Sequence, residues 1–134
     1  MAESNTYHAS CSCGDVKITT SGKPVRISVC HCHACQQRTG SAFGVQARFA
    51  RLDVTISGKT TIYQREADSG NSVTFHFCPT CGNTMYYFLD GMKDFIAIPV
   101  GTFADADFPA PNISIYEERQ HPWVMLEGDF DHID

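Results

Sequence analysis

The chain has 134 residues, a length at which proteins build a single hydrophobic core, so we expect one domain over residues 1–134. Ten Lys and Arg against fifteen Asp and Glu give a formal net charge of −5. An acidic chain lacks the basic face that binds nucleic acid, so we expect no nucleic-acid partner. No apolar run approaches the ~20 residues that span a bilayer, and residues 1–10 lack the basic and apolar parts of a signal peptide. We therefore expect a cytoplasmic protein without a membrane partner.

Short segments rich in β-branched and aromatic residues, separated by turn signals, predict a mainly β protein. No segment keeps a helical apolar period for three turns, and residues 34–39 predict a single short turn of helix. We expect the core to cover about residues 7–126 and the acidic residues 127–134 to form a frayed surface tail. The expected strands, in chain order, are Val16–Thr20, Val25–Val29, Phe43–Phe49, Val54–Ser57, Thr60–Arg65, Ser72–Phe77, Thr84–Phe88, Phe95–Val100, Ile113–Tyr116 and Val124–Leu126.

Seven cysteines are the most informative feature of the composition. An odd number of thiols in a reducing compartment does not suit a disulfide framework, and a thioredoxin-like redox motif expects a βαβ context that is not visible here. The spacings C-x-C-G, C-H-C-x-x-C and C-P-x-C-G each let one tight turn direct several sulfurs to a common point. They predict zinc ligation. The three groups are Cys11 and Cys13; Cys30, Cys32 and Cys35; and Cys78 and Cys81.

Seven ligands divide most naturally into four and three, because a structural zinc takes four ligands whereas a catalytic zinc takes three and keeps one position open. The two glycine-ended pairs would supply the closed structural site, with ligands Cys11, Cys13, Cys78 and Cys81. The middle group would supply the open catalytic site, with ligands Cys30, Cys32 and Cys35. In the alternative division, the middle group and one pair close a single site and the other pair has no metal.

Polar residues near the middle group are candidates for further roles. His31 and His33 alternate with the cysteines, so either could replace a ligand or carry a proton near neutral pH. The simpler interpretation is that both histidines face away from the metal. Arg38 and Ser41, in the following R-T-G-S segment, could receive a substrate carboxylate, or could simply belong to a turn.

The order of these motifs resembles the glutathione-dependent formaldehyde-activating family, which is also linked to centromere protein V. The resemblance implies a tent-like β fold of small twisted sheets around a structural zinc, with a second zinc bound by three cysteines at the active site. It also implies an activity that joins glutathione to formaldehyde, whose reverse is a carbon–sulfur lyase step. The stretches that carry the resemblance are Cys11–Gly14, Cys30–Phe43, Phe77–Gly82 and Ile115–Trp123.

Two classes of function follow from these observations. The first is a zinc-dependent carbon–sulfur lyase or adduct synthase that acts on a thiol such as glutathione and on a small aldehyde such as formaldehyde. A zinc with three thiolate ligands carries a net negative charge, so it suits a soft sulfur ligand better than it suits the activation of water. The second class is a zinc-stabilised module that binds a protein partner and has no catalytic activity.

Overall fold

The computed structural model describes residues 5–67 and 70–133. Within them lie eleven strands and one α-helix, so the prediction of a mainly β protein is confirmed. Helix α1 (His33–Thr39) follows the third strand, and no helix in the described part of the chain is long and apolar enough to cross a membrane. The strands are β1 (Thr6–Ser10), β2 (Lys17–Ser21), β3 (Arg26–Cys30), β4 (Gly44–Ala50), β5 (Val54–Ser57), β6 (Thr61–Glu66), β7 (Ser72–Phe77), β8 (Thr84–Leu89), β9 (Phe95–Pro99), β10 (Ile113–Ile115) and β11 (Asp131–Ile133).

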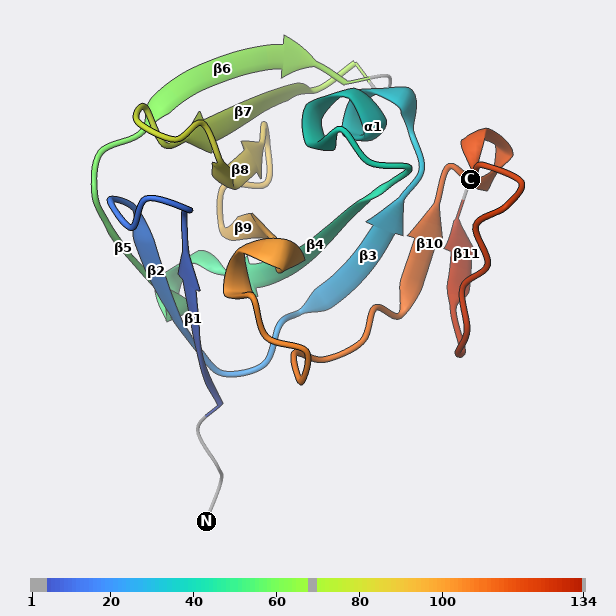
Figure 1. Cartoon of the computed structure of the whole chain (residues 1–134), viewed down its shortest axis with the longest axis horizontal. Coiled ribbons are helices and arrows are strands. Elements are labelled where there is room, and N and C mark those ends of the chain that lie inside the picture. Colours follow the sequence, from blue (N-terminus) through green and yellow to red (C-terminus); the bar gives the residue numbers. More distant parts are fainter. Residues whose placement is uncertain (1–4, 68–69, 134) are drawn as a thin grey trace.

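The strands form two sheets, one of three strands in the order β1-β2-β5 and one of eight in the order β11-β10-β3-β4-β9-β8-β7-β6. Neighbouring strands are antiparallel except at β10, which runs parallel to both β3 and β11. Figure 1 shows the larger sheet curving from β6 and β7 round to β10 and β11, with the smaller sheet at one side. Helix α1 lies near the ends of β3 and β7. Three 3₁₀ helices lie in the connections: η1 (Arg51–Asp53), η2 (Val100–Phe103) and η3 (Glu117–Arg119).

The two faces of the larger sheet have different compositions, because side chains alternate between faces along each strand. One face packs the fully buried Phe49, Ile96 and Ile98 against residues of the smaller sheet such as Ile18. Each large apolar side chain buried in this way contributes roughly 1.5–3 kcal/mol of transfer free energy. The opposite face carries Cys30 of β3 and a smaller apolar cluster that is centred on Val73, Phe75 and Tyr87. This second face positions the candidate site.

The predicted strands from Val16–Thr20 to Ile113–Tyr116 are all present, with ends that differ by no more than one residue. The prediction of a strand at Val124–Leu126 is wrong, because these residues lie in the loop between η3 and β11. Their short apolar run meets no strand edge. The side-chain amide of Gln120 instead donates a hydrogen bond to the carbonyl oxygen of Val124, at 2.9 Å.

Two strands were not predicted from the sequence. Strand β1 is largely exposed and polar, and it forms because β2 offers an antiparallel partner over its whole length. Strand β11 lies in the tail that was expected to fray, and that expectation is wrong for its three residues. All three are exposed, and they are held by parallel pairing with β10 and by a 2.8 Å contact between His132 Nδ1 and Glu117. Both strands depend on partners that are distant in the sequence.

Candidate metal centre

The first cysteine cluster joins two turns that are far apart in the sequence. Cys11 and Cys13 follow β1, Cys78 and Cys81 follow β7, and the four sulfurs all lie within 4.8 Å of one another. The sulfur of Cys13 lies 3.6 Å from those of both Cys11 and Cys78. Cys11 and Cys78 are buried, whereas Cys13 is exposed. The cluster therefore connects the smaller sheet to the larger one.

The two turns of this cluster have the same local form. Gly14 and Gly82 each have a positive φ, 85° and 81°, a conformation that side chains other than glycine adopt at a cost. The N–H of Gly14 donates to the carbonyl of Cys11 at 3.1 Å, and that of Gly82 donates to the carbonyl of Cys78 at 2.9 Å. The backbone N–H of Val16 also donates to the sulfur of Cys11, at 3.3 Å, which favours the thiolate form.

Side chains outside the cysteine motifs also connect the two turns. The amide oxygen of Asn83 accepts a hydrogen bond from the backbone N–H of Ser12 at 2.6 Å and from the thiol of Cys81 at 3.3 Å. A hydrogen bond from the backbone N–H of Asn83 is the main cause that lowers the pKa of Cys81 to about 6. Thr80 donates its hydroxyl to Asp15 across the same junction, at 3.2 Å. The sequence analysis did not identify these residues, because the pairing of the two turns is not a local feature.

The second cysteine cluster is local. Cys30 ends β3, Cys32 caps the N-terminus of α1 and Cys35 lies within α1, so their three buried sulfurs also lie within 4.8 Å of one another. The N–H of Cys35 donates to the sulfur of Cys32 at 3.3 Å, as expected for an N-cap. Hydrogen bonds from the thiols of Cys30 and Cys35 lower the pKa of Cys32 to about 2. The hydrogen bond between Cys30 and Cys32 in turn raises the pKa of Cys30.

Both clusters have the donor chemistry of a soft divalent metal site. Four zinc-bound sulfurs in a tetrahedron lie about 3.8 Å apart at a Zn–S distance of about 2.3 Å. The 3.6 Å separations in the first cluster fit this geometry. Among the described residues, these two clusters are the groups close enough to share an ion, and neither includes a histidine or a carboxylate. The sulfurs are thus grouped as four and three, the first of the two divisions considered from the sequence.

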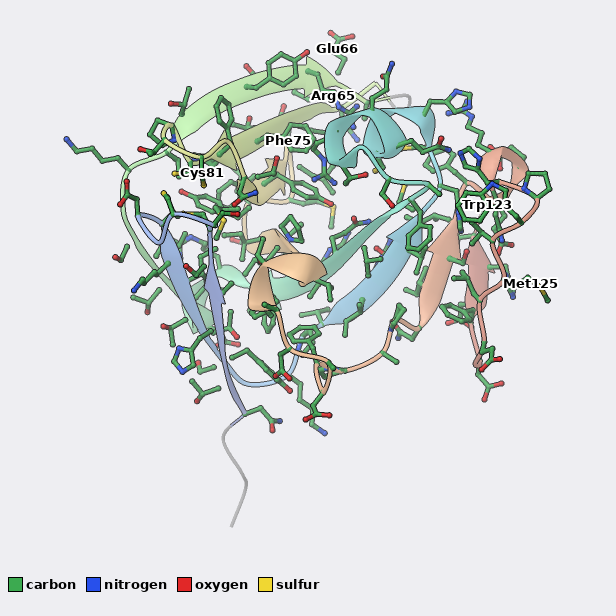
Figure 2. All side chains as sticks on the ribbon, in the orientation of Figure 1. Arg65, Glu66, Phe75, Cys81, Trp123 and Met125 are labelled. Atoms are coloured by element: carbon green, nitrogen blue, oxygen red, sulfur yellow. The ribbon has the colours of Figure 1, made fainter. Side chains whose placement is uncertain are left out.

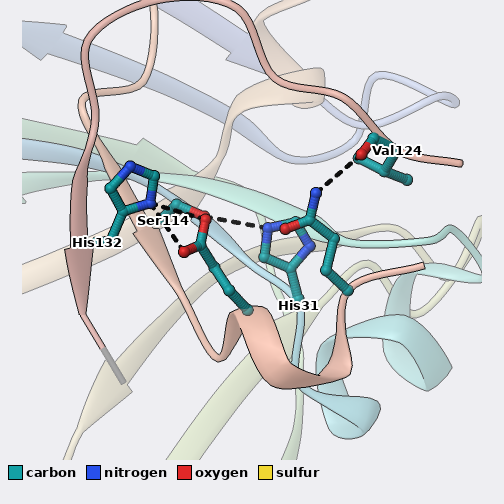
Figure 3. A network of polar contacts seen from close by, with 6 residues as sticks. His31, Ser114, Val124 and His132 are labelled. Carbon is teal, nitrogen blue, oxygen red and sulfur yellow. Dashed lines mark hydrogen bonds and ion pairs between the residues drawn. The ribbon is translucent and has the colours of Figure 1, made fainter. Parts of the chain in front are cut away.

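The two histidines beside the second cluster lie in different surroundings. His31 is fully buried and faces Ser114, whose hydroxyl lies 3.1 Å from His31 Nε2 (Figure 3). Ser114 donates in turn to Glu117 at 2.9 Å, and Glu117 contacts His132. Burial lowers the pKa of His31, so this side chain is neutral at pH 7. His33 is exposed at the start of α1.

Gln36 attaches the second cluster to the last third of the chain. Its side-chain amide donates to the carbonyl oxygens of His31, at 2.8 Å, and of Arg119, at 3.2 Å. Its amide oxygen lies 2.9 Å from His121 Nε2. These contacts hold η3 and the following loop against α1, which explains why the segment Ile115–Trp123 belongs with the cysteine motifs.

The second cluster borders a pocket of about 190 Å³ on the face of the larger sheet that carries Cys30. Arg38 also lines this pocket, and its guanidinium carbon lies 5.3 Å from the ring centre of Phe75 and 5.4 Å from that of Tyr87. Figure 2 shows Phe75 and Arg65 beside α1. Ser41 is exposed and lines a separate, more open groove of about 790 Å³, which Arg38 also borders. The two residues that were expected to bind substrate therefore face partly different spaces.

The pocket also contains charged and polar residues that the sequence analysis did not identify, namely Arg26, Gln46, Arg48 and Arg65. Side chains alternate between the two faces of a strand, so Arg26 lies on the same face of β3 as Cys30. The sequence alone could therefore have indicated this residue. Gln46 and Arg48 depend on strand register, because β4 pairs them with Ser28 and Arg26. Arg65 on β6 depends on the pairing of that strand with β7. Burial raises the pKa of Tyr87, which also lines the pocket, so its phenol remains protonated at neutral pH.

The fold is mainly β, with a four-cysteine cluster between its two sheets and a three-cysteine cluster at a pocket. These features define a class of small proteins with two potential metal sites. The chain belongs to the family of the glutathione-dependent formaldehyde-activating enzyme, whose sequence model matches residues 6–119. A crystal structure of a Rhodobacter sphaeroides protein has a similar fold, with a TM-score of 0.58 and 20% sequence identity over 75% of this chain and 90% of that one. No curated protein matches the sequence.

Proposed function

We propose that this protein is a zinc-dependent carbon–sulfur lyase or adduct synthase that acts on a thiol and a small aldehyde in the cytoplasm. The observation that carries the proposal is the position of the second cluster, whose three sulfurs border a pocket that a small molecule can enter. Membership of the formaldehyde-activating family supports glutathione and formaldehyde as the first pair of substrates to test. The first cluster has a structural role in this proposal, with one zinc held by Cys11, Cys13, Cys78 and Cys81.

In the reaction, the substrate thiol loses its proton and its sulfur adds to the aldehyde carbon. A carbon–sulfur bond forms as the π bond of the carbonyl group breaks, and the carbonyl oxygen takes up the proton to become a hydroxyl group. The reverse reaction breaks this bond and returns the proton to the sulfur. Cys30, Cys32 and Cys35 would hold the second zinc, which when bound supplies a Lewis acid that favours the thiolate form of a thiol.

Other residues of the chain have supporting roles in this proposal. The positive charge of Arg38 at the pocket attracts a substrate carboxylate, with Ser41 as a second contact in the adjoining groove. His33 is exposed at the start of α1, next to Cys32, and is not among the residues that line the pocket, so in this proposal it would exchange the proton of the adduct hydroxyl only at the pocket's margin with solvent. The buried ring of Phe75 gives the pocket one of its apolar walls.

The test is exchange NMR with ¹³C-formaldehyde and glutathione, combined with metal analysis. The uncatalysed addition is itself fast, so the rate must be compared with the same mixture without protein and with protein stripped of metal. We expect the wild type to contain two zinc ions and to exceed the background rate. The variant Cys32→Ala should fold, contain one zinc ion and return to the background rate.

A wild-type rate equal to the background in protein with two zinc ions would overturn the proposal. That result would instead support the second class considered from the sequence, a zinc-stabilised module that binds a protein partner. The exposed side chains of Trp123 and Met125 on the C-terminal loop (Figure 2) would then be the first surface to examine.

A further inference from the structure

The pocket at the second cluster concentrates positive charge. Four of the ten Lys and Arg residues line it, and all four are partly buried. No Asp or Glu in the described ranges lines the pocket, and none of them forms an ion pair with these arginines. The thiolates of the second cluster offset part of the charge of Arg38 and Arg65. The remaining positive charge in a partly buried pocket is costly unless a further anion neutralises it. The four residues are Arg26, Arg38, Arg48 and Arg65.

Two of these arginines face each other directly. Arg26 on β3 and Arg48 on β4 are register partners in the antiparallel pair, and like charges in opposed positions destabilise a sheet. Burial, followed by the charge of Arg26, lowers the pKa of Arg48. The pair lies on the same face of the sheet as Cys30, because Cys30 pairs with Gly44, and Arg26 and Arg48 lie four residues further along their strands. An anion beside both guanidinium groups, on this face of the sheet, would relieve the repulsion.

The other two arginines are held in place by aromatic rings. The guanidinium carbons of Arg38 and Arg65 both lie 5.3 Å from the ring centre of Phe75, within the range of a cation–π contact. Such a contact fixes the planar group and leaves most of its N–H donors available; one Nη of Arg65 donates to the carbonyl oxygen of Glu66, at 3.3 Å. The Nε atom of Arg38 is buried without a hydrogen-bond partner, and so is Oε1 of Gln46. Buried polar atoms are rarely unpaired, so the donor Nε of Arg38 indicates a ligand that accepts a hydrogen bond, whereas Oε1 of Gln46 requires a donor and is not satisfied by a carboxylate.

The rest of the pocket limits the ligand to a small organic molecule. Its walls include the apolar side chains of Val73, Leu89, Ala97 and Ile115, which favour a carbon skeleton over an inorganic ion. The volume of about 190 Å³ is below the roughly 300 Å³ at which small-molecule sites usually begin. A peptide thiol would have to leave most of its atoms outside. A compact acid of four or so carbon atoms fits within.

We propose that the pocket selects a small thiol that carries two carboxylates, with its sulfur at Cys30, Cys32 and Cys35 and its carboxylates on the arginines. One carboxylate binds between Arg26 and Arg48, and the other binds at Arg38 and Arg65. The proposal rests on the proposed function, because the reacting group is the thiol of that reaction. The arginines then distinguish a dicarboxylate from a neutral thiol of the same size.

The direct test is calorimetric titration of the zinc-loaded protein with four probes. Mercaptosuccinate has the thiol and both carboxylates, succinate has only the carboxylates, 1-thioglycerol has only the thiol, and inorganic phosphate has charge without a carbon skeleton. We expect mercaptosuccinate to bind most tightly, succinate to bind measurably, and the other two to bind at least tenfold more weakly than mercaptosuccinate. Thioglycerol or phosphate binding as tightly as mercaptosuccinate would overturn the proposal, as would the absence of succinate binding at millimolar concentration.

Variants connect binding to the named residues. Arg48→Gln should weaken succinate binding about tenfold or more, since hydrogen bonds to charged groups contribute about 1.5–3 kcal/mol. Lys59→Gln is the matched control because it removes one positive charge from an exposed position outside the pocket, and its affinity should change less than twofold. Because Arg48→Gln removes a repulsive pair, its thermal midpoint without ligand should not fall. Equal affinities in the two variants would contradict the proposal.

The succinate titration also separates this inference from the proposed function, because succinate cannot form a thiol adduct. If succinate binds and depends on Arg48 but the exchange rate stays at background with mercaptosuccinate as well as with glutathione, the anion site stands and the reaction does not. If the exchange rate exceeds background with glutathione but succinate does not bind, the reaction stands and the dicarboxylate specificity is wrong. A rise in the thermal midpoint of the wild type with succinate gives a second readout that needs no variant.

Discussion

The four-cysteine cluster draws its sulfurs from turns separated by 65 residues, whereas the three-cysteine cluster lies entirely within residues 30–35. The first joins the three-stranded sheet to the eight-stranded sheet through Cys11, Cys13, Cys78 and Cys81. The second lies at the end of β3 and the start of α1 and borders the arginine pocket. A metal bound at distant turns contributes its binding free energy to folding, whereas a metal on one short segment can be lost locally. In the proposed function, two sites with the same kind of ligand would thus serve stability and chemistry separately.

The largest expected effect is that of Cys78→Ser. Cys78 is fully buried in the first cluster, so its loss removes a ligand and places a hydroxyl group in an apolar environment. We expect the variant to lose cooperative unfolding at room temperature, because structural zinc contributes up to about 10–16 kcal/mol to the folding of small zinc domains. Circular dichroism and metal analysis check this. A folded variant with two zinc ions would show that the first cluster is not structural.

The matched change in the second cluster is Cys32→Ser. Because the ligands of this cluster are local, we expect one zinc ion to be lost, adduct formation to fall to background, and the free energy of unfolding to change by less than about 2 kcal/mol. Urea unfolding and metal analysis measure the two quantities on the same sample. Unfolding as severe as that of Cys78→Ser would remove the contrast between the clusters.

A smaller effect is expected from Gly82→Ala and Gly40→Ala, which change one turn beside each cluster. Both glycines have positive φ, 81° and 68°, and a Cβ at either position meets nothing within 4 Å. The conformational cost is therefore similar, about 1–2 kcal/mol for a residue other than glycine in the left-handed region. We expect Gly82→Ala also to speed the release of the first zinc to a chelator, and Gly40→Ala to leave that rate unchanged. Equal rates of zinc release in the two variants would contradict separate roles for the two clusters.

The smallest effect concerns the attachment of β11 beside the second cluster. Hydrogen bonds from His132 and then from Ser114 lower the pKa of Glu117 below its ordinary value of 4.5. The contact therefore stabilises the fold fully above about pH 4.5, and its contribution is lost as the pH falls through the lower pKa of the folded state. We expect the amide signals of residues 131–133 to shift more in the wild type than in Glu117→Gln as the pH falls below about 4.5, with Asp131 contributing equally in both proteins. The same acid-side shift in both proteins would exclude this carboxylate as the cause.

The sequence was sufficient to predict the features that depend on residues close together along the chain. The cysteine motifs indicated both clusters, because C-x-C-G and C-H-C-x-x-C fix the relative positions of their own sulfurs. Asn83 and Arg48 were not identified, because their roles come from the pairing of turns and strands distant along the chain. The same reason explains the omission of β1 and β11, and the wrong strand at Val124–Leu126 shows that an apolar run without a neighbouring strand edge remains a loop.

The parallel position of β10 between β3 and β11 has a consequence for association between copies of the chain. Strand β10 has the sequence I-S-I, and without a neighbour it would present an apolar, unpaired backbone edge of the kind that pairs with other molecules. Strand β11 covers that edge with D-H-I, which is short and polar at two of its three positions. By covering this edge, the acidic end of the chain disfavours edge-to-edge aggregation at the margin of the larger sheet.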